Sequence, residues 1–436
     1  MELLAILLFI SIFLLILYGY PVAFTLGGIS MLYAWCFLDP STFSALPPRI
    51  MGVMSNYVLL AVPLFIFMGI MLEKSGLAES LLETMTILFG RLRGGLAISV
   101  VIVGALLAAS TGIVGATVVT MGLISLPTML KRGYQPELAT GTIAAAGTLG
   151  QIIPPSVVLV LLGSVLNVSV GKLFAAALLP GLLLIVAYIV YIALRAALRP
   201  ETAPPMPAAE IRAFRQHGFW GKVVKAFFLP FFLIVAVLGS IFAGIASPTE
   251  AAAVGALGAT LLTMLQGRFK LDVLRAVMRE TTHLTSMVFI ILLGATVFSF
   301  VFREMEGDVY LVELIRQSDL SPLAFLALVM VVVFVVGFFI DFIEIIFIVV
   351  PVVAPIFVEL GVDLLWIGVL LGINLQTSFL SPPFGFSLFY LKGVAPAEIT
   401  TGHLYRGILP FLAIQLLFLA LIIAYPELIY WLGGKP

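Results

Sequence analysis

The chain has 436 residues, of which 62% are hydrophobic and only 10% are charged, and its 22 basic residues balance 22 acidic ones. Soluble domains carry about 25% charged residues, so this composition excludes a soluble globular protein and predicts a polytopic membrane protein in a lipid bilayer. The zero net charge gives no support for a nucleic-acid partner, and the single cysteine, Cys36, excludes an internal disulfide or a cysteine metal cluster.

The apolar segment at the N-terminus, residues 3–20, is the first expected span. It follows Glu2 rather than a basic segment, and Tyr18-Gly19-Tyr20-Pro21 offers no small-residue cleavage site. A secretory signal peptide has a basic N-terminal segment and a small-residue cleavage site, and this segment has neither. We therefore expect a retained membrane span rather than a signal peptide.

Four further crossings are expected in the first half, so that each half has five crossings and one hairpin. Segment 95–130 is apolar but holds Ser110-Thr111-Gly112 at its middle, so we expect a re-entrant hairpin, or two short spans, that returns to its starting side. The other crossings of this half are expected at 21–38, 56–73, 136–166 and 173–195.

Two apolar segments, at about 136–166 and 364–391, are each interrupted by a Pro-Pro pair. Proline inside a helix removes a backbone donor, and an unpaired backbone group costs several kcal/mol in lipid. Such breaks persist where they are buried in protein or line a cavity, and a matched pair of them indicates a transporter's binding site. The candidate substrate-binding residues are Gln151, Pro154, Pro155, Ser156, Asn374, Ser381, Pro382 and Pro383. In the alternative interpretation, these polar side chains only form hydrogen bonds between helices.

The positions of Pro and Gly indicate an internal duplication. Pro21 and Gly28 recur as Pro248 and Gly255, 227 residues later, and 174–180 is echoed by 404–410. Four further matches share an offset of 228 residues: Pro127 with Pro355, Gly133 with Gly361, Pro154 with Pro382, and Pro155 with Pro383. We expect a first repeat at 1–199, a cytoplasmic linker at 200–225, and a second repeat at 226–436 with its hairpin at about 320–358.

Because five crossings is an odd number, the two repeats are expected to have inverted topology. With both termini placed on the periplasmic side, all but five of the 22 Lys and Arg residues fall in predicted cytoplasmic segments, including the linker. The positive-inside rule supports this orientation. The five basic residues on the opposite side are Arg49, Lys172, Arg303, Arg316 and Lys435.

Asp341 lies deep in the apolar segment 329–358, where a carboxylate costs roughly 2.5–3.5 kcal/mol. In the repeat it aligns near Gly112, so both positions are expected to mark hairpin tips. Backbone carbonyls and short polar side chains there can hold a hard cation such as Na⁺, which prefers oxygen ligands. The candidate Na⁺-binding residues are Ser110, Thr111, Gly112, Thr148, Gly150, Asp341, Gln376, Thr377 and Ser378. In the alternative interpretation, Asp341 caps a half-helix and Glu344 faces water or a partner.

Ser247-Pro248-Thr249-Glu250 has the pattern of a capping box and predicts the start of a helix. The sequence holds no His-Glu-x-x-His, Gly-x-Ser-x-Gly or P-loop motif, so we do not expect an enzyme or an ATPase. Coupling to an ion gradient is then the remaining source of energy for transport.

Several motifs closely resemble those of the large membrane subunit of TRAP (tripartite ATP-independent periplasmic) transporters, the DctM-like family. They are Gly-Ile-Ala-Ser-Pro-Thr-Glu-Ala-Ala-Ala-Val-Gly at 244–255, Ile-Ile-Pro-Pro-Ser at 152–156, Leu-Leu-Pro-Gly at 178–181, and Ser-Pro-Pro-Phe-Gly at 381–385. Together these motifs are specific, and the similarity covers essentially the whole chain.

The resemblance implies Na⁺-coupled uptake of an organic acid across the bacterial inner membrane. It implies two partners: a periplasmic substrate-binding protein (DctP-like) and a small four-helix membrane subunit (DctQ-like). It also implies an elevator-type motion of a domain that carries both hairpins and both broken helices. Since no arginine lies inside either broken helix, we expect backbone dipoles and hydroxyls to bind the substrate carboxylate.

Two other functions remain open on the sequence. The chain could be a standalone ion-coupled permease that needs no binding protein, in which case it would take up substrate alone. It could also be a passive channel or an assembly scaffold, which would permit counterflow without accumulation.

Overall fold

The structure is a computed structural model that describes residues 2–112, 114–215, 219–318 and 320–431. Over these residues the fold is helical throughout and contains no strand, which confirms the predicted all-α class. Seven of the described helices are long and apolar enough to span a membrane, or eight if the bent pair α18–α19 forms one span.

The first half of the chain contributes ten α-helices and three 3₁₀ turns. They are α1 (Glu2–Leu17), α2 (Val22–Phe37), η1 (Pro40–Ala45), α3 (Leu46–Met54), η2 (Tyr57–Leu60), α4 (Ala61–Lys74), α5 (Leu77–Phe89), α6 (Gly95–Thr111), α7 (Val114–Lys131), α8 (Pro136–Thr148), η3 (Leu149–Gln151), α9 (Val157–Val165) and α10 (Val170–Leu198).

The linker and the second half are also built of helices and short helical turns. The linker holds η4 (Pro200–Thr202), α11 (Ala208–Arg215), α12 (Phe219–Val223) and the π-helical turn η5 (Val224–Phe228). The second half holds α13 (Leu229–Phe242), α14 (Pro248–Leu265), α15 (Leu271–Glu304), α16 (Gly307–Gln317), α17 (Pro322–Val336), α18 (Phe342–Ile348), α19 (Val350–Glu359), α20 (Leu364–Leu380), α21 (Phe386–Val394), α22 (Thr401–Ala424) and η6 (Pro426–Ile429).

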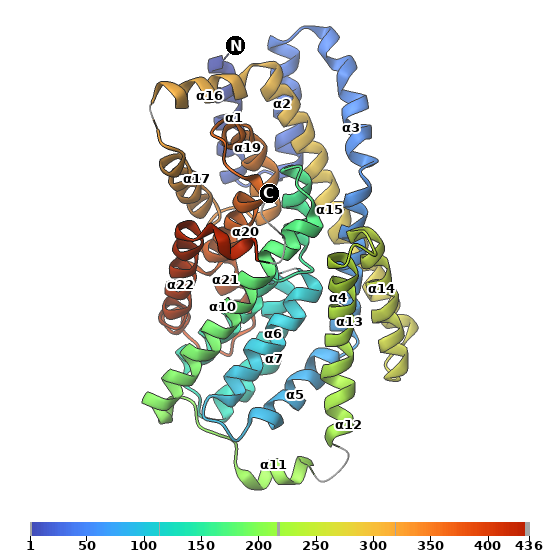
Figure 1. Ribbon diagram of the computed structural model, residues 1–436, viewed down its shortest axis with the longest axis vertical. Helices are drawn as coiled ribbons and strands as arrows, with labels where there is room; N and C mark the ends of the chain where they lie inside the picture. The colour runs from blue at the N-terminus through green and yellow to red at the C-terminus, as the bar shows by residue number, and fades with distance from the viewer. Residues whose placement is uncertain (1, 113, 216–218, 319, 432–436) are drawn as a thin grey trace.

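Several described helices are shorter than a membrane crossing, or lie between the five crossings per half that the sequence predicts. The apolar helices α1, α2 and α20 have 16, 16 and 17 residues, fewer than the about 20 that span a hydrocarbon core. The helices α3, α5 and α16 lie between the predicted crossings. Figure 1 shows α16 lying across one end of the molecule beside the N-terminus, and α11 lying at the opposite end.

Small residues let the segment at 95–130 pack closely against α8. Helices α6 and α7 lie against each other and both contact α8. A Cβ added at Gly104 would lie 2.7 Å from the Cβ of Ala146, and α6 ends at Gly112 in a left-handed conformation, with φ of 63°. Such close backbone approach is typical of helix contacts in membranes, where Gly and Ala are enriched.

The linker is tied to the base of this pair of helices by backbone hydrogen bonds. The Gly94 amide donates to the Ala203 carbonyl at 3.0 Å, and the Gln135 amide donates to the Thr202 carbonyl at 2.9 Å. Arg132 forms an ion pair with Glu210 at 2.7 Å, and this hydrogen bond lowers the pKa of the Glu210 carboxyl. The linker therefore fixes the end of the α6–α7 pair nearest α11.

Replacing Tyr134 with phenylalanine is expected to destabilise the protein. The buried Tyr134 hydroxyl accepts a hydrogen bond from the Leu96 amide at the start of α6, at 3.2 Å, and burial raises its pKa to about 12. Removing the hydroxyl leaves a buried amide unpaired, which costs about 1–3 kcal/mol. The apparent melting temperature in detergent should fall for Tyr134→Phe and stay unchanged for Tyr18→Phe, whose side chain is exposed. Equal melting temperatures for the two variants would contradict this role.

Candidate functional site

The two broken helices meet at one contact between buried polar side chains. Gln376 Nε2 of α20 donates to Thr148 Oγ1 at the end of α8, over a long 3.5 Å. Both residues are fully buried. They are separated by 228 residues, the same offset that relates the two Pro-Pro pairs in the sequence. The structure thus brings together two of the predicted Na⁺-binding residues, one from each half.

Three side-chain amide atoms of the two broken helices have no hydrogen-bond partner among the described residues. Both side-chain polar atoms of Gln151 and the Oε1 of Gln376 are buried and unpaired there. An unpaired buried polar group costs about 1–3 kcal/mol, so native proteins keep few of them. These atoms can therefore bind a ligand at the centre of the molecule.

The first Pro-Pro pair lies in a fully buried, non-helical segment between η3 and α9. Ser156 caps α9, since its Oγ accepts from the Leu159 amide at 3.4 Å and donates to the Gln151 carbonyl at 2.8 Å. Gln151, Pro154, Pro155 and Ser156 are all buried. The N-terminus of α9, the end of a helix where backbone amides lack partners within the helix, therefore borders this segment.

The second Pro-Pro pair is more open than the first. The Pro383 carbonyl accepts a hydrogen bond from the Tyr405 hydroxyl at 2.8 Å, and both Pro383 and Phe384 are exposed. Ser381 is buried and donates to the Thr377 carbonyl at 2.9 Å, while Pro382 is half-buried. Both Pro-Pro peptide bonds are cis.

Each Pro-Pro break packs against the helical pair of its own half through glycine. A Cβ added at Gly150 would overlap the Ala108 carbonyl of α6 and lie 2.8 Å from the Ala108 Cα. A Cβ added at Gly337, just after α17, would lie 2.8 Å from the Cβ of Ser378. No side chain fits at either contact, so backbone and short polar groups approach closely there.

Asp341 caps α18, as the alternative interpretation of the sequence has it. Its Oδ1 accepts from the Phe342 amide at 2.8 Å, and the Glu344 Oε2 accepts from the Asp341 amide at 3.1 Å. The two carboxylates form a capping box, and both residues are half-buried. Glu344 therefore contacts its own helix start, a contact that the sequence analysis missed although the Asp-x-x-Glu spacing indicates it.

The described side chains of Asn374, Thr377 and Ser378 form hydrogen bonds elsewhere than at the Gln376–Thr148 contact. Asn374 donates to the Met330 carbonyl of α17 at 2.7 Å, and Thr377 and Ser378 donate to carbonyls of their own helix. Ser110 and Thr111 form the last turn of α6, and their side chains lie outside the described part of the structure.

A second buried contact between the halves was missed by the sequence analysis. Gln415 Nε2 of α22 donates to the Tyr188 hydroxyl of α10 at 2.8 Å, and both side chains are fully buried. The two residues are 227 residues apart, whereas the echoed segments 174–180 and 404–410 of the same two helices are 230 apart, so Tyr188 and Gln415 are not equivalent positions of the repeat. The signal available in the sequence is one polar side chain inside each of two long apolar spans.

The described fold is that of a polytopic helical membrane protein in which two interrupted helices meet at a buried polar centre. Residues 9–428 match the family model of the DctM component of tripartite ATP-independent periplasmic (TRAP) transporters. The chain therefore belongs to this family. It is thus a TRAP transporter large permease subunit, as its motifs predict, and permease subunits are not enzymes.

Two curated relatives are named as TRAP transporter subunits, and one solved structure shares the fold. It is 33% identical to a C4-dicarboxylate TRAP transporter large permease protein of Pseudomonas aeruginosa, over 93% of this chain and 94% of that protein. It is 30% identical to a sialic acid TRAP transporter large permease protein of Vibrio cholerae, over 94% and 93% respectively. The crystal structure of the Alcanivorax borkumensis YdaH transporter shares the fold, with a TM-score of 0.65, 16% identity, and coverage of 99% and 100%.

Proposed function

We propose that the chain is the translocating subunit of a Na⁺-coupled transporter that takes up an organic acid delivered by a periplasmic binding protein. A small four-helix membrane subunit is its second partner. The observation that carries this proposal is the buried contact of Gln376 with Thr148, together with the buried, unpaired amide of Gln151, three residues after Thr148. A buried polar centre between two interrupted helices is the arrangement that ion-coupled carriers use.

Na⁺ fits the residues around this centre better than a transition metal does. Among the described residues, no group of three His, Cys, Asp or Glu side chains could hold a metal ion. The groups that the candidate Na⁺-binding residues offer are hydroxyl, amide and backbone carbonyl oxygens, together with one carboxylate, that of Asp341. Hard cations prefer such oxygen ligands, so we propose one Na⁺ site at each hairpin tip, facing the Pro-Pro break of its half.

An organic acid fits the Pro-Pro segments because each precedes a helix N-terminus. The nine-residue helix α9 begins at Val157 and α21 begins at Phe386, directly after the two breaks. Positive helix ends and unpaired amides favour a carboxylate. The two relatives reported above are named for C4-dicarboxylates and for sialic acid, and both compounds carry carboxylate groups.

Inverted repeats and an elevator motion complete the proposal. Helix α2 packs on α15 of the other half, and α14 packs reciprocally on α4. Such reciprocal packing, and a polar contact between two residues 228 apart at the Pro-Pro breaks, are expected of two halves related by a pseudo-two-fold axis. In this scheme both termini are periplasmic, the linker is cytoplasmic, and the domain that carries both hairpins and both broken helices moves as one body.

Replacing Asp341 with asparagine is expected to separate its charge from its role as a cap. Asparagine caps helices about as well as aspartate, so the melting temperature should change little, whereas alanine should cost about 1 kcal/mol. Without the carboxylate, the Na⁺ concentration that gives half-maximal uptake should rise about tenfold, equivalent to 1.4 kcal/mol. If uptake by Asp341→Asn depends on Na⁺ in the same way as uptake by the wild type, Asp341 is not a ligand of the ion site.

Reconstitution in proteoliposomes distinguishes the candidate functions. The chain is incorporated with its small membrane subunit, and succinate uptake is measured with and without the binding protein. Accumulation that needs both the binding protein and an inward Na⁺ gradient supports the proposal. Uptake by the chain alone would identify a standalone permease, and counterflow without accumulation would identify a passive channel.

A further inference from the structure

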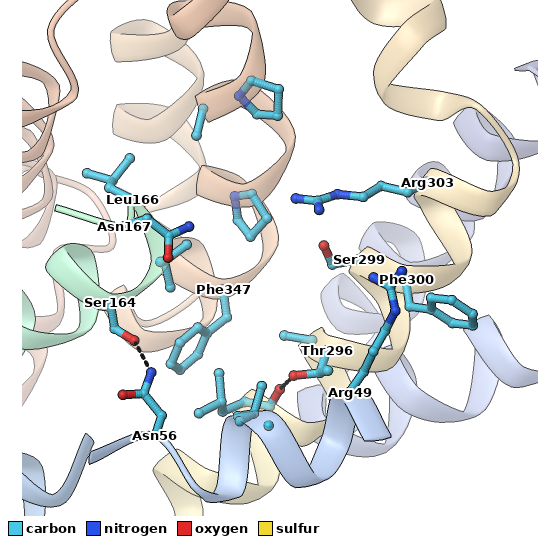
Figure 2. Close-up of a pocket in the computed structure, with 18 of the residues that line it drawn as sticks. Arg49, Asn56, Ser164, Leu166, Asn167, Thr296, Ser299, Phe300, Arg303 and Phe347 are labelled. Carbon is cyan, nitrogen blue, oxygen red and sulfur yellow. Dashed lines mark hydrogen bonds between the residues drawn. The ribbon is translucent and has the colours of Figure 1, made fainter. Parts of the chain in front are cut away.

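A cavity of about 610 Å³ lies on the side of the molecule that carries Arg49 and Arg303, away from the Gln376–Thr148 contact. Helices α3 and α15 form one wall, and α18, α19 and the turn between α9 and α10 form the other. Figure 2 shows the Arg303 side chain extending from α15 into this cavity, with Arg49 and Ser299 beside it. The volume lies within the range of pockets that bind small molecules.

The charges that line this cavity are all positive. Its lining includes Arg49 and Arg303 but, among the described residues, no aspartate or glutamate. Arg303 forms no ion pair within the described part of the chain, and the guanidinium carbon of Arg49 lies 4.6 Å from the centre of the Phe300 ring. Two guanidinium groups in a partly apolar cavity whose described lining holds no acidic residue create a positive potential that attracts anions.

The opposite wall connects the cavity to the second hairpin. Phe347 of α18 lines the cavity, six residues after the helix cap at Asp341. A hydrogen bond from Asn56 Nδ2 to Ser164 Oγ, at 3.3 Å, joins the two walls next to Phe347 (Figure 2). An anion held in the cavity would therefore lie between α15 and the hairpin that we propose as part of the transport domain.

We propose that this cavity is an anion-binding vestibule in which Arg49 and Arg303 hold the carboxylate of the incoming substrate before it reaches the central site. The inference rests on the proposed uptake of an organic acid. Guanidinium groups match carboxylates with paired hydrogen bonds, which lysine cannot reproduce. The vestibule supplies the arginine that the broken helices lack, at the entrance rather than at the centre.

A fluorescent label in the vestibule tests the proposal on the full chain in lipid nanodiscs. Cys36 is replaced by serine, and Gly52→Cys is labelled with bimane, because Gly52 lines the cavity and a Cβ there meets nothing within 4 Å. Succinate should change the emission saturably, and its neutral analogue succinamide should not. Iodide should quench the label more strongly than neutral acrylamide does.

Variants of the two arginines decide the outcome. In the Arg49→Gln/Arg303→Gln double variant, the half-saturating succinate concentration should rise at least tenfold and iodide quenching should fall. The matched control Lys172→Gln removes a charge on the same predicted side, outside the cavity lining, and should change neither measurement. The double lysine variant should keep the iodide quenching and lose succinate affinity, which separates charge from guanidinium geometry.

Parallel uptake measurements separate this inference from the proposed function. Unchanged succinate binding and iodide quenching in the double glutamine variant would overturn the vestibule, even if the wild type accumulates substrate. If the wild type shows no Na⁺-driven uptake but its succinate binding depends on the two arginines, the proposed function is wrong. The vestibule then remains an anion site.

Discussion

Replacing Gln376 with leucine is expected to abolish Na⁺-coupled uptake while leaving the protein as stable as the wild type, or more stable. The Gln376 Oε1 is buried without a partner among the described residues, and its Nε2 makes only the long bond to Thr148. An apolar group of similar shape can replace an unsatisfied polar group at no cost in stability. Thr148 keeps its hydrogen bond to the Ala145 carbonyl, at 2.9 Å. Melting in detergent and uptake in proteoliposomes measure the two effects separately.

Gln415→Leu is the matched control for this experiment. It removes the same kind of side chain from a buried contact between the halves, but there the Tyr188 hydroxyl loses its partner. Its expected cost is about 1–3 kcal/mol of stability, with Na⁺-coupled uptake retained. If Gln376→Leu accumulates substrate as the wild type does, the polar centre between the broken helices is not the ion or substrate site.

Replacing Gly150 with alanine is expected to damage both stability and transport. The added Cβ would lie 2.8 Å from the Ala108 Cα and overlap the Ala108 carbonyl, and backbone atoms cannot rotate away. Helix α6 must then move from the first Pro-Pro segment, at a cost of about 3 kcal/mol, the upper part of the range for overpacking. The proposed Na⁺ site at this hairpin would be lost with it. Melting temperature and uptake of the purified variant provide the measurement.

Gly239→Ala serves as the control for this substitution. Gly239 lies inside α13, and a Cβ added there meets nothing within 4 Å, so alanine should stabilise the helix by about 0.5–1 kcal/mol. Identical behaviour of Gly150→Ala and Gly239→Ala would mean that the close approach of α6 to the first break does not matter for transport.

Local chemistry made part of this structure predictable. Pro248 with Ser247 and Glu250 predicts a helix start, and the structure confirms the complete capping box there. The all-α class follows from composition alone, because only helices satisfy long apolar segments in lipid. The family membership was predictable from motifs, since they recur over the whole chain.

Tertiary packing was not predictable in the same way. Nothing local to Gly150 indicates that it lies against Ala108, and nothing local to Gln376 indicates Thr148 as its neighbour. The helices α5 and α16 were missed because they carry charged residues such as Glu79 and Arg316, and a search for apolar spans passes over amphipathic segments. For Asp341, the sequence supported both an ion ligand and a helix cap, and the structure shows the cap.

We propose that Na⁺ binds at the hairpin tips, against the two broken helices, and drives uptake. It is tested most directly by succinate accumulation in proteoliposomes that hold the chain, its small membrane subunit and the binding protein, with Na⁺ outside replaced stepwise by choline. We expect accumulation that falls to zero without Na⁺, and none for Gln376→Leu at any Na⁺ concentration. Accumulation that is unchanged in choline would contradict it.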